Sequence, residues 1–380
     1  MSLFFFIIFG LYGGMHVYLF LRAHRVLSFG LGTGILLAFF MLIMVFAILL
    51  IRILERHGYE YSAQALSYIG YSWMAVIFLF FCTSLFFDFI NLVIRAVGDI
   101  SRLNVSGYLV SHRVSFFISM ILALVVSGYG YFEAKDIQTE RITIETSKLP
   151  QGTDRLTIAQ ISDVHLGLII REQRLARMLE MVREAKPDIL LSTGDLVDAE
   201  INHLTGLAEL LREVPTTLGS YAITGNHEYY AGIKKAIAFT RNAGFTLMQN
   251  SFVEAGPIII AGVDDRTAIQ MQIQEPVSEQ ELLKKLPRDR FILFLKHQPR
   301  IDPSAIGLFD LQLSGHTHKG QIFPFSLITY SLYPSHAGIL DLGSGSLLYV
   351  NRGTGTWVPP VRFLAPPEVT IIELVRKPGS

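Results

Sequence analysis

The chain has 380 residues, of which 51% are hydrophobic and 17% are charged, and its formal net charge is zero. A balanced charge leaves no basic footprint for nucleic acid, so we expect no nucleic acid partner. The single cysteine, Cys82, excludes disulfides within the chain. The apolar excess lies in the first 132 residues. The composition therefore predicts an apolar region at 1–132, a connector at 133–153 and a globular domain at 154–380.

Four apolar runs in the first region are each long enough to cross a bilayer as a helix, which takes about 20 residues. They are Leu3–Leu21, Phe29–Ile51, Tyr71–Ile94 and Val114–Tyr131. The first run has no basic start and no small-residue cleavage site, so we interpret it as a span rather than a signal peptide. The sequence predicts an α-helical transmembrane region of about four helices, in a multi-pass protein of the cell (inner) membrane with the lipid bilayer as a partner.

The basic residues between these runs favour one orientation in the membrane. With four spans, the first and third loops share a side and carry five arginines: Arg22, Arg25, Arg95, Arg102 and Arg113. The opposite side has four basic residues: Arg52, Arg56, Lys135 and Arg141. The positive-inside rule then places the C-terminal domain on the extracytoplasmic face. A cytoplasmic domain is the alternative, because a different number of spans inverts the assignment.

Asp88 lies inside the third apolar run, where a carboxylate is rare and often functional. Asn91 and Arg95 follow it by one and two helical turns, which supplies polar partners on the same face of the helix. We interpret Asp88 as paired near the interface, with a transport or relay role as the alternative.

From residue 156 onward, short β-rich runs alternate with helical periodicity. Strands are expected at Leu156–Ile161, Ile189–Ser192, Tyr221–Thr224, Ile258–Gly262, Phe291–Leu295, Leu311–Ser314, Ser346–Val350 and Val369–Leu374. Helices are expected at Arg171–Ala185, Leu204–Val214 and Lys234–Arg241. Strands that alternate with helices and end in a strand-rich tail predict a layered α/β sandwich.

Five short motifs, each directly after an apolar run, contain side chains of the types that bind metals. They are Asp163-Val164-His165, Gly194-Asp195-Leu196-Val197-Asp198, Gly225-Asn226-His227-Glu228, Lys296-His297-Gln298-Pro299 and Gly315-His316-Thr317-His318. The chain has 11 histidines, and five of them fall in these motifs. Since ligands at the ends of parallel strands share one crevice, we expect a single site.

The spacing within the motifs favours a site for two metals. Side chains two apart in an extended segment point the same way, so Asp163 and His165 converge, and His316 and His318 repeat the arrangement. Asp195 follows a glycine that allows a sharp turn, and its two carboxylate oxygens can bridge two cations. Mixed imidazole and carboxylate ligation suits manganese, iron or zinc. The sequence predicts two divalent transition-metal ions as cofactors.

Two such cations about 3.5–4 Å apart hold a bridging hydroxide and the phosphoryl oxygens for in-line displacement at phosphorus. The leaving oxygen then needs a proton. His227, beside the ligand candidate Asn226, is placed to supply that proton, and Asp198 is the candidate to orient its ring.

Taken in order, the motifs resemble the calcineurin-like metallophosphoesterase superfamily, whose pattern is D-x-H, G-D-x-x-D, G-N-H-E, H and G-H-x-H. The resemblance covers residues 156–373 and implies a four-layer α/β/β/α sandwich that hydrolyses phosphoric ester bonds. It implies that one metal is bound by Asp163, His165, Asp195 and His318. It implies that the other is bound by Asp195, Asn226, His297 and His316, with His227 and Asp198 as the acid pair.

Within the superfamily, the segments at 315–321, 349–355 and 360–362 look most like bacterial phosphodiesterases of the YaeI and YkuE type. Two departures bear on the substrate. Ala199 stands where protein serine/threonine phosphatases carry an arginine, which argues against phosphoprotein hydrolysis. Lys319 stands where relatives usually have glycine, so it either contacts the substrate or lies at the rim of the site without a role in binding. Arg352, in a glycine-rich turn, is either a bidentate phosphate clamp or a solvated turn residue.

The sequence therefore predicts a membrane-anchored di-metal phosphoesterase, and a phosphodiesterase before a monoesterase. Its substrate would be a phosphate ester or pyrophosphate. A lipid-linked substrate fits the anchor, because tethering raises the local concentration of amphipathic phosphates. The alternative is a non-catalytic membrane sensor or scaffold that uses a phosphoesterase fold. The intact ligand set and the Asp198–His227 pair argue against that alternative.

Overall fold

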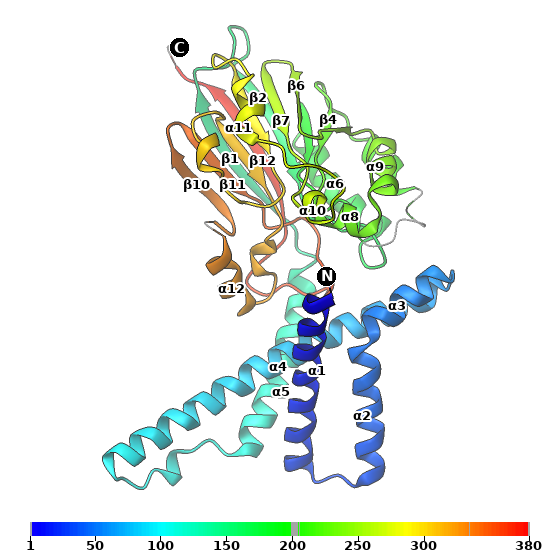
Figure 1. The fold of residues 1–380 in the computed structure, drawn as a ribbon, viewed down its shortest axis with the longest axis vertical. Helices are drawn as coiled ribbons and strands as arrows, with labels where there is room; N and C mark the ends of the chain where they lie inside the picture. The colour runs from blue at the N-terminus through cyan, green and yellow to red at the C-terminus, as the bar shows by residue number, and fades with distance from the viewer. Residues whose placement is uncertain (1, 199–203, 205, 334, 379–380) are drawn as a thin grey trace. The chain divides into compact units, whose positions relative to one another are not determined.

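A computed structural model describes residues 2–198, 204, 206–333 and 335–378 (Figure 1). The chain divides into two compact units. The helical unit comprises Met1–Phe132 and Val358–Phe363, and the sandwich unit comprises Glu133–Trp357 and Leu364–Ser380. A short C-terminal segment thus belongs to the helical unit, although the rest of that half of the chain belongs to the sandwich unit.

The helical unit contains the four predicted apolar runs. Its helices are α1 (Ser2–Leu27), α2 (Leu31–Val45), α3 (Ala47–Arg56), α4 (Glu60–Ser101), η1 (Ser106–Tyr108) and α5 (His112–Glu133). Within the described residues, the segments 60–101 and 106–133 are long and apolar enough to cross a membrane. The pair α2 and α3 qualifies as a third only if its 60° bend is counted as one broken span. The number of four spans stays a prediction.

Asp88, inside α4, is paired in a different way from the one predicted. Its carboxylate forms an ion pair with Arg22 and accepts a hydrogen bond of 2.6 Å from the Tyr18 hydroxyl, and both partners come from α1. Asn91 instead exchanges hydrogen bonds of 2.9 and 2.8 Å with the backbone of Val110. The prediction that Asn91 would be the partner of Asp88 was wrong, because side chains of the neighbouring helix α1 reach the Asp88 carboxylate instead. Asp88 therefore links two helices, which supports the structural interpretation.

The strands of the sandwich unit form two six-stranded sheets (Figure 1). The first has the order β1 (Gln138–Thr146), β12 (Glu368–Arg376), β2 (Arg155–Ile161), β3 (Ile189–Ser192), β4 (Ser220–Ala222), β5 (Thr246–Leu247). The second has the order β10 (Gly338–Gly343), β11 (Ser346–Val350), β9 (Leu311–Ser314), β8 (Phe291–Leu295), β7 (Ile258–Gly262), β6 (Ser251–Ala255). Both sheets are mixed, and the runs β2–β3–β4–β5 and β11–β9–β8–β7 are parallel.

Helices cover the outer face of each sheet, and a shared core lies between the sheets. One apolar cluster joins the first sheet to α6 (Glu172–Glu184), α7 (Leu207–Arg212) and α9 (Ile233–Asn242). Another joins the second sheet to α11 (Glu279–Lys284), with Leu283 packed among residues such as Phe294. A third contains Leu191 of the first sheet and Leu293 of the second. The layers follow the predicted α/β/β/α order.

Several predicted strands begin and end at the predicted residues, namely those at 189–192, 258–262, 291–295, 311–314 and 346–350. The segment 133–153, expected as a connector, contains β1, which pairs in parallel with β12 along its whole length. Polar residues alternate along β1, and most of its side chains are at least partly exposed. An edge strand with one face exposed to solvent lacks the continuous apolar run that marks the central strands, so the sequence did not predict β1.

Candidate metal centre

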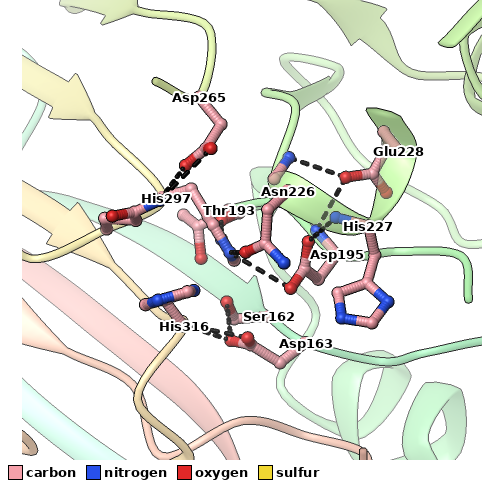
Figure 2. A network of polar contacts seen from close by, with 12 residues as sticks. Ser162, Asp163, Thr193, Asp195, Asn226, His227, Glu228, Asp265, His297 and His316 are labelled. Carbon is pink, nitrogen blue, oxygen red and sulfur yellow. Dashed lines mark hydrogen bonds and ion pairs between the residues drawn. The ribbon is translucent and has the colours of Figure 1, made fainter. Parts of the chain in front are cut away.

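The five motifs lie at the carboxyl ends of parallel strands from both sheets (Figure 2). Asp163 and His165 follow β2, Asp195 follows β3, Asn226 opens the short helix α8 (Asn226–Ala231) after β4, His297 follows β8, and His316 follows β9. His318 opens the short turn η3 (His318–Gly320). All of these side chains are buried except that of His316, which is half-buried. The two sheets therefore deliver the predicted ligands to one place.

Three groups of histidine and aspartate in the described part of the chain bring their ligand atoms within 4.8 Å of one another. The groups are Asp163, His165 and His318; Asp195, His297 and His316; and His165, Asp195 and His227. We call the first group side A and the second, with Asn226, side B. Asp195 belongs to the third group as well as to side B, so it lies where a ligand shared by two cations would lie.

On side A, two imidazole nitrogens face each other. The Nε2 atoms of His165 and His318 are 3.1 Å apart, and His318 Nε2 is 3.4 Å from an Asp163 carboxylate oxygen. Two ligands that are each about 2.1 Å from one cation lie roughly 3.0–3.4 Å apart at angles near 90–110°. The buried Nδ1 of His165 has no hydrogen-bond partner among the described residues. These separations fit a cation held among the three side chains.

On side B, the tautomer of His297 is fixed by a backbone carbonyl. Its Nδ1 donates to the Thr193 oxygen at 2.8 Å, so Nε2 carries the lone pair of the neutral ring (Figure 2). That atom lies 3.2 Å from an Asp195 oxygen and 3.3 Å from the Asn226 side-chain oxygen. Three acceptors converge on one point. Burial lowers the pKa of His297, but Asp195 outweighs it and holds this pKa well above its usual value. The Asp195 carboxylate thus favours a positive charge at the centre of side B, as a bound metal ion would supply.

Local hydrogen bonds aim the two carboxylates. Asp163 accepts from the Ser162 hydroxyl at 2.6 Å and from the His316 backbone N–H at 2.9 Å. Asp195 accepts from the His227 backbone N–H at 2.8 Å. Burial raises the pKa of Asp163 to about 6. Burial also opposes ionisation of Asp195, but the neighbouring His297 and His227 hold its pKa well below the usual value.

The backbone of the ligand residues adopts a conformation that most residues avoid. Asp163, His165, Asp195, His316 and His318 have φ angles of 51°, 54°, 51°, 71° and 47°. Non-glycine residues with positive φ are uncommon and gather at active sites, where surrounding contacts hold the strain. The strained turns direct the ligands out of the strand ends and toward the shared point.

Two motif glycines are required by close packing. A Cβ on Gly225 would overlap the Asp195 carboxylate, and a Cβ on Gly315 would overlap the Ser162 hydroxyl and the Asp163 carboxylate. Both overlaps involve groups that hold or form the ligand set. Any larger residue at these positions would push a ligand out of place.

Glu228, the last residue of the G-N-H-E motif, has a supporting role that the sequence did not reveal. Its buried carboxylate accepts from the backbone N–H groups of Gly225 at 2.6 Å, Asp195 at 3.0 Å and Leu196 at 2.8 Å. Glu228 therefore ties the loop after β3 to the start of α8. The sequence signal is a glutamate three residues after the glycine that precedes the helix, as in a capping box. Burial, reinforced by Asp195, raises the pKa of Glu228 to about 7.

His227 and Asp198 are in contact, as predicted. His227 Nδ1 lies 2.9 Å from the Asp198 carboxylate, and its ring packs edge-on against His165 and Trp357, with centroids 4.5 and 5.6 Å away. Burial alone would lower the pKa of His227, but Asp195 and Asp198 raise it to about 9. The pair therefore holds a proton at the edge of side A.

Of the two predicted substrate-binding residues, Lys319 directly follows the predicted ligand His318, whereas Arg352 is paired with carboxylates. The Arg352 guanidinium forms ion pairs with Glu140, at 2.5 Å, and with Glu368. These two carboxylates bind the guanidinium that was predicted to bind a phosphate. Lys319 continues η3 after His318, where its backbone N–H donates to the Thr317 hydroxyl at 3.3 Å. A substrate role for Lys319 stays a prediction, and the geometry of Arg352 favours a structural role.

A cavity of about 320 Å³ opens beside His297, and its lining includes Arg266 and Arg300. The Arg300 guanidinium lies over the Tyr333 ring at 5.3 Å, and that ring packs edge-on against His316 at 5.7 Å. Sequence reasoning missed Arg300, although it lies three residues after His297 in the same motif loop. The cavity provides basic side chains next to side B.

Comparisons with known proteins show the family to which the chain belongs. The family model for calcineurin-like phosphoesterases matches residues 156–320. A metallophosphoesterase of Aquifex aeolicus is 39% identical over 260 residues, which cover 68% of this chain and 99% of that protein. The chain belongs to the calcineurin-like metallophosphoesterases. This membership confirms the predicted family and makes the protein a hydrolase of phosphoester bonds.

Two other relatives of this metallophosphoesterase are informative. YkuE of Bacillus subtilis is 34% identical over 268 residues, covering 65% of this chain and 90% of YkuE. A zebrafish (Danio rerio) transmembrane protein with metallophosphoesterase domain is 30% identical over 270 residues, covering 68% of this chain and 62% of that protein. Among solved structures, a dimetal phosphatase from Danio rerio aligns with 14% identity over 54% of this chain and 88% of its own, at a TM-score of 0.34.

Proposed function

We propose that this protein is a membrane-anchored phosphodiesterase that uses two divalent transition-metal ions. One observation carries the proposal: Asp195 reaches both sides of the site, with one carboxylate oxygen 3.2 Å from His297 Nε2 and 3.9 Å from His165 Nε2. A carboxylate between two sets of imidazole ligands is suited to bind a cation on each side.

The donor set fits manganese, iron or zinc, because each side offers both nitrogen and oxygen ligands. When bound, a pair of such ions supplies a water nucleophile at neutral pH and polarises the phosphoryl oxygens. Side A would use Asp163, His165, Asp195 and His318, and side B would use Asp195, Asn226, His297 and His316. The chain's own contribution is to hold these ligands in place before the ions arrive, and all of them except Asn226 and His297 lie in strained turns.

His227 supplies the proton that the leaving oxygen needs. Its Nδ1 contacts Asp198 at 2.9 Å, which leaves Nε2 on the opposite edge of the ring for the substrate. The Asp198 carboxylate favours the charged ring and fixes its orientation. His227 therefore acts as the general acid, and Asp198 acts as a positioning residue.

A diester is proposed before a monoester on electrostatic grounds. A monoester dianion carries one more charge than a diester and requires more cationic contacts near the metals. Arg352, the clamp predicted for such a charge, is held by Glu140 and Glu368 instead. The basic side chains of the cavity beside side B share its lining with four carboxylates, those of Asp264, Asp265, Glu275 and Glu279. The segments at 60–101 and 106–133 support a membrane anchor and make a lipid-linked phosphate the proposed class of substrate. We propose an extracytoplasmic catalytic domain, and a topology reporter fused to the C-terminus tests this against a cytoplasmic one.

The test uses the full chain purified in detergent. After chelation, bis(p-nitrophenyl) phosphate should not be hydrolysed, and manganese, iron or zinc should restore hydrolysis. The monoester p-nitrophenyl phosphate should be the poorer substrate. Hydrolysis that survives both chelation and the Asp195→Asn substitution would end the two-metal proposal. Inactivity with every metal and ester, together with full cellular function of His227→Ala, would favour a sensor or scaffold.

A further inference from the structure

A short helix of the sandwich unit, α12 (Phe325–Leu332), carries an apolar surface that is open to its surroundings. Along this helix and its N-terminal flank, the exposed large side chains are Phe323, Phe325, Leu327, Ile328, Tyr330 and Leu332, and we call them the α12 surface. Leu327, Tyr330 and Leu332 are 62%, 66% and 64% exposed. No charged residue occurs from 321 to 340. Soluble surfaces seldom expose so many large apolar groups together without a partner.

The α12 surface is attached to the segment that carries metal ligands. Gly320, which ends η3, lies so close to Ser326 that a Cβ on the glycine would overlap the backbone of α12. Further contacts come from the other end, where the Thr317 hydroxyl donates to the His336 carbonyl at 2.7 Å and the Tyr330 ring packs against His336 at 5.3 Å. Whatever binds the α12 surface is therefore brought close to the loop that contains His316 and His318.

The chemistry of this surface favours a lipid interface as its occupant. A helix of eight residues is too short to span a bilayer, which takes about 20 residues. A short helix with phenylalanine, tyrosine and leucine side chains can lie in the headgroup region instead. A bilayer is also always nearby if 106–133 spans one, because the sandwich unit begins at Glu133.

Chain continuity joins the same region to the helical unit. Within the sandwich unit, Gln321 and Trp357 exchange side-chain to backbone hydrogen bonds of 2.8 and 2.9 Å, and the Trp357 ring packs against His227. The next six residues, 358–363, belong to the helical unit, where the Arg362 N–H donates to the Gly130 carbonyl of α5 at 2.9 Å. The chain thus passes from a residue beside the general acid to the last turns of a candidate span within a few residues.

We propose that the α12 surface inserts into the lipid interface of the membrane that anchors the chain, and that the site takes phosphodiesters of amphipathic lipids directly from that interface. The proposal rests on the phosphodiesterase function proposed above. It adds a surface that determines which substrates reach the metals. Water-soluble esters do not need this surface and enter the site from solution.

The first experiment measures insertion without activity. A fluorophore sensitive to polarity (NBD) is attached at Leu327→Cys in a Cys82→Ser background, and the full chain is reconstituted in phosphatidylcholine–phosphatidylglycerol vesicles. Insertion should shift the emission of the dye to the blue, and spin-labelled lipids should quench it. The control is Phe252→Cys on β6, where the native side chain is 46% exposed. Equal quenching at both positions, or none at position 327, would overturn the proposal. Crosslinking of an unquenched position 327 to a protein would assign the surface to a protein partner instead.

The second experiment separates the two proposals. Leu327→Asp should slow hydrolysis of a phospholipid diester in vesicles about tenfold, since burying one leucine in an apolar phase is worth at least that factor. Hydrolysis of bis(p-nitrophenyl) phosphate should stay within about twofold, because its binding needs no apolar burial. The matched control Phe252→Asp should change neither rate. Equal loss on both substrates would refute the lipid route. Quenching at position 327 with no diester hydrolysis by the wild type would refute the phosphodiesterase and leave the insertion standing.

Discussion

Side A and side B offer similar ligands, but the chain holds them differently. On side B, the Thr193 carbonyl fixes His297 through its Nδ1, so the ligand nitrogen is aimed before any ion binds. On side A, the Nδ1 of His165 is buried without a hydrogen-bond partner among the described residues. Partners behind a ligating histidine fix its tautomer and raise its metal affinity. The comparison teaches that a hydrogen bond preorganises His297 on side B, whereas His165 on side A is positioned by its backbone conformation and by packing against the rings of His227 and His318.

The two sides are nevertheless connected through the backbone. The N–H of His316, a side B ligand, donates to both oxygens of Asp163 on side A at 2.9 Å. His227 donates its N–H to Asp195 from the other direction. A change in one ligand loop therefore reaches both sides. We expect two metal-binding steps of different affinity, with side B filled first.

The largest effect should come from Asp195→Asn, which removes the ligand shared by both sides. Hydrolysis of an aryl diester should fall roughly 10³-fold or more, because an amide neither bridges nor neutralises two cations. Metal analysis should show fewer than two ions per chain. The control Asp154→Asn alters an exposed carboxylate and should leave both measurements unchanged. Full metal content in Asp195→Asn would contradict a shared ligand.

His297→Ala and His165→Ala test the difference between the sides directly. Each should lower activity about 10²-fold or more, since each removes one ligand of a catalytic ion. In wild-type protein, a chelator should release one ion readily and the second slowly. His297→Ala should abolish the slow phase, and His165→Ala the fast one. If both variants lose the same phase, the two sides do not differ in preorganisation.

Glu228→Gln should produce a smaller loss, of about 10–100-fold in kcat, as for other residues that support metal ligands. The introduced NH₂ group would face backbone N–H donors that now meet a carboxylate oxygen, so the loop carrying Asp195 should shift. The melting temperature should also fall, because a buried donor left unpaired costs about 1–3 kcal/mol. Glu180→Gln on the exposed face of α6 is the matched control. An unchanged kcat with a lowered melting temperature would limit Glu228 to a purely structural role.

Much of this architecture could be predicted from the sequence, for physical reasons. Strands such as 291–295 are buried on both faces, so a continuous apolar run marks them from end to end. Ligands such as Asp163 and His297 were predictable because each follows such a run directly. Strand β1 was not, because polar residues alternate along this edge strand. Helix α12 was not, because its polar residue Thr329 is buried whereas its large apolar residues such as Leu327 are exposed, which reverses the usual helical pattern.

The missed roles depend on partners that the sequence cannot place. The Thr193 carbonyl that fixes His297 lies more than a hundred residues away along the chain. The partners of Arg352 come from β1 and β12, and β1 lay in the segment expected as a connector. Backbone groups and edge strands carry no motif. The groups that hold the ligands and Arg352 in place can therefore be identified only in the folded structure.

Asp198→Asn should lower kcat about tenfold and change its pH dependence, because a misoriented acid loses part of the 10²–10⁴-fold that proton transfer contributes. The pKa of His227 is raised to about 9, and Asp198 is one of the causes. The protonated form is the donor, so kcat should fall as pH rises through this pKa. Cations bound to Asp195 would offset its negative charge. Asp198 would then be the main group that raises the pKa of His227. In the variant, the alkaline fall in kcat should therefore move to lower pH. An alkaline limb that does not move would exclude His227 as the acid oriented by Asp198.

The smallest effect on activity should come from Arg352→Ala, which lies on neither side of the metal centre. Its guanidinium is paired with Glu140 and Glu368, and the Glu368 side chain is only 2% exposed. Removing one partner of a buried pair leaves an uncompensated charge and costs about 3 kcal/mol of unfolding free energy. The melting temperature should fall, whereas KM and kcat for the aryl diester should stay within about threefold, since RT ln 3 is well below the loss in stability. A raised KM with an unchanged melting temperature would show that Arg352 is the phosphate clamp after all.

Arg352→Lys sharpens the test, because a lysine keeps a single charge for Glu368 but loses the fork that reaches both carboxylates. If the stability of Arg352→Lys lies between those of the wild type and Arg352→Ala, Arg352 stabilises the edge formed by β1 and β12 and does not act in the site.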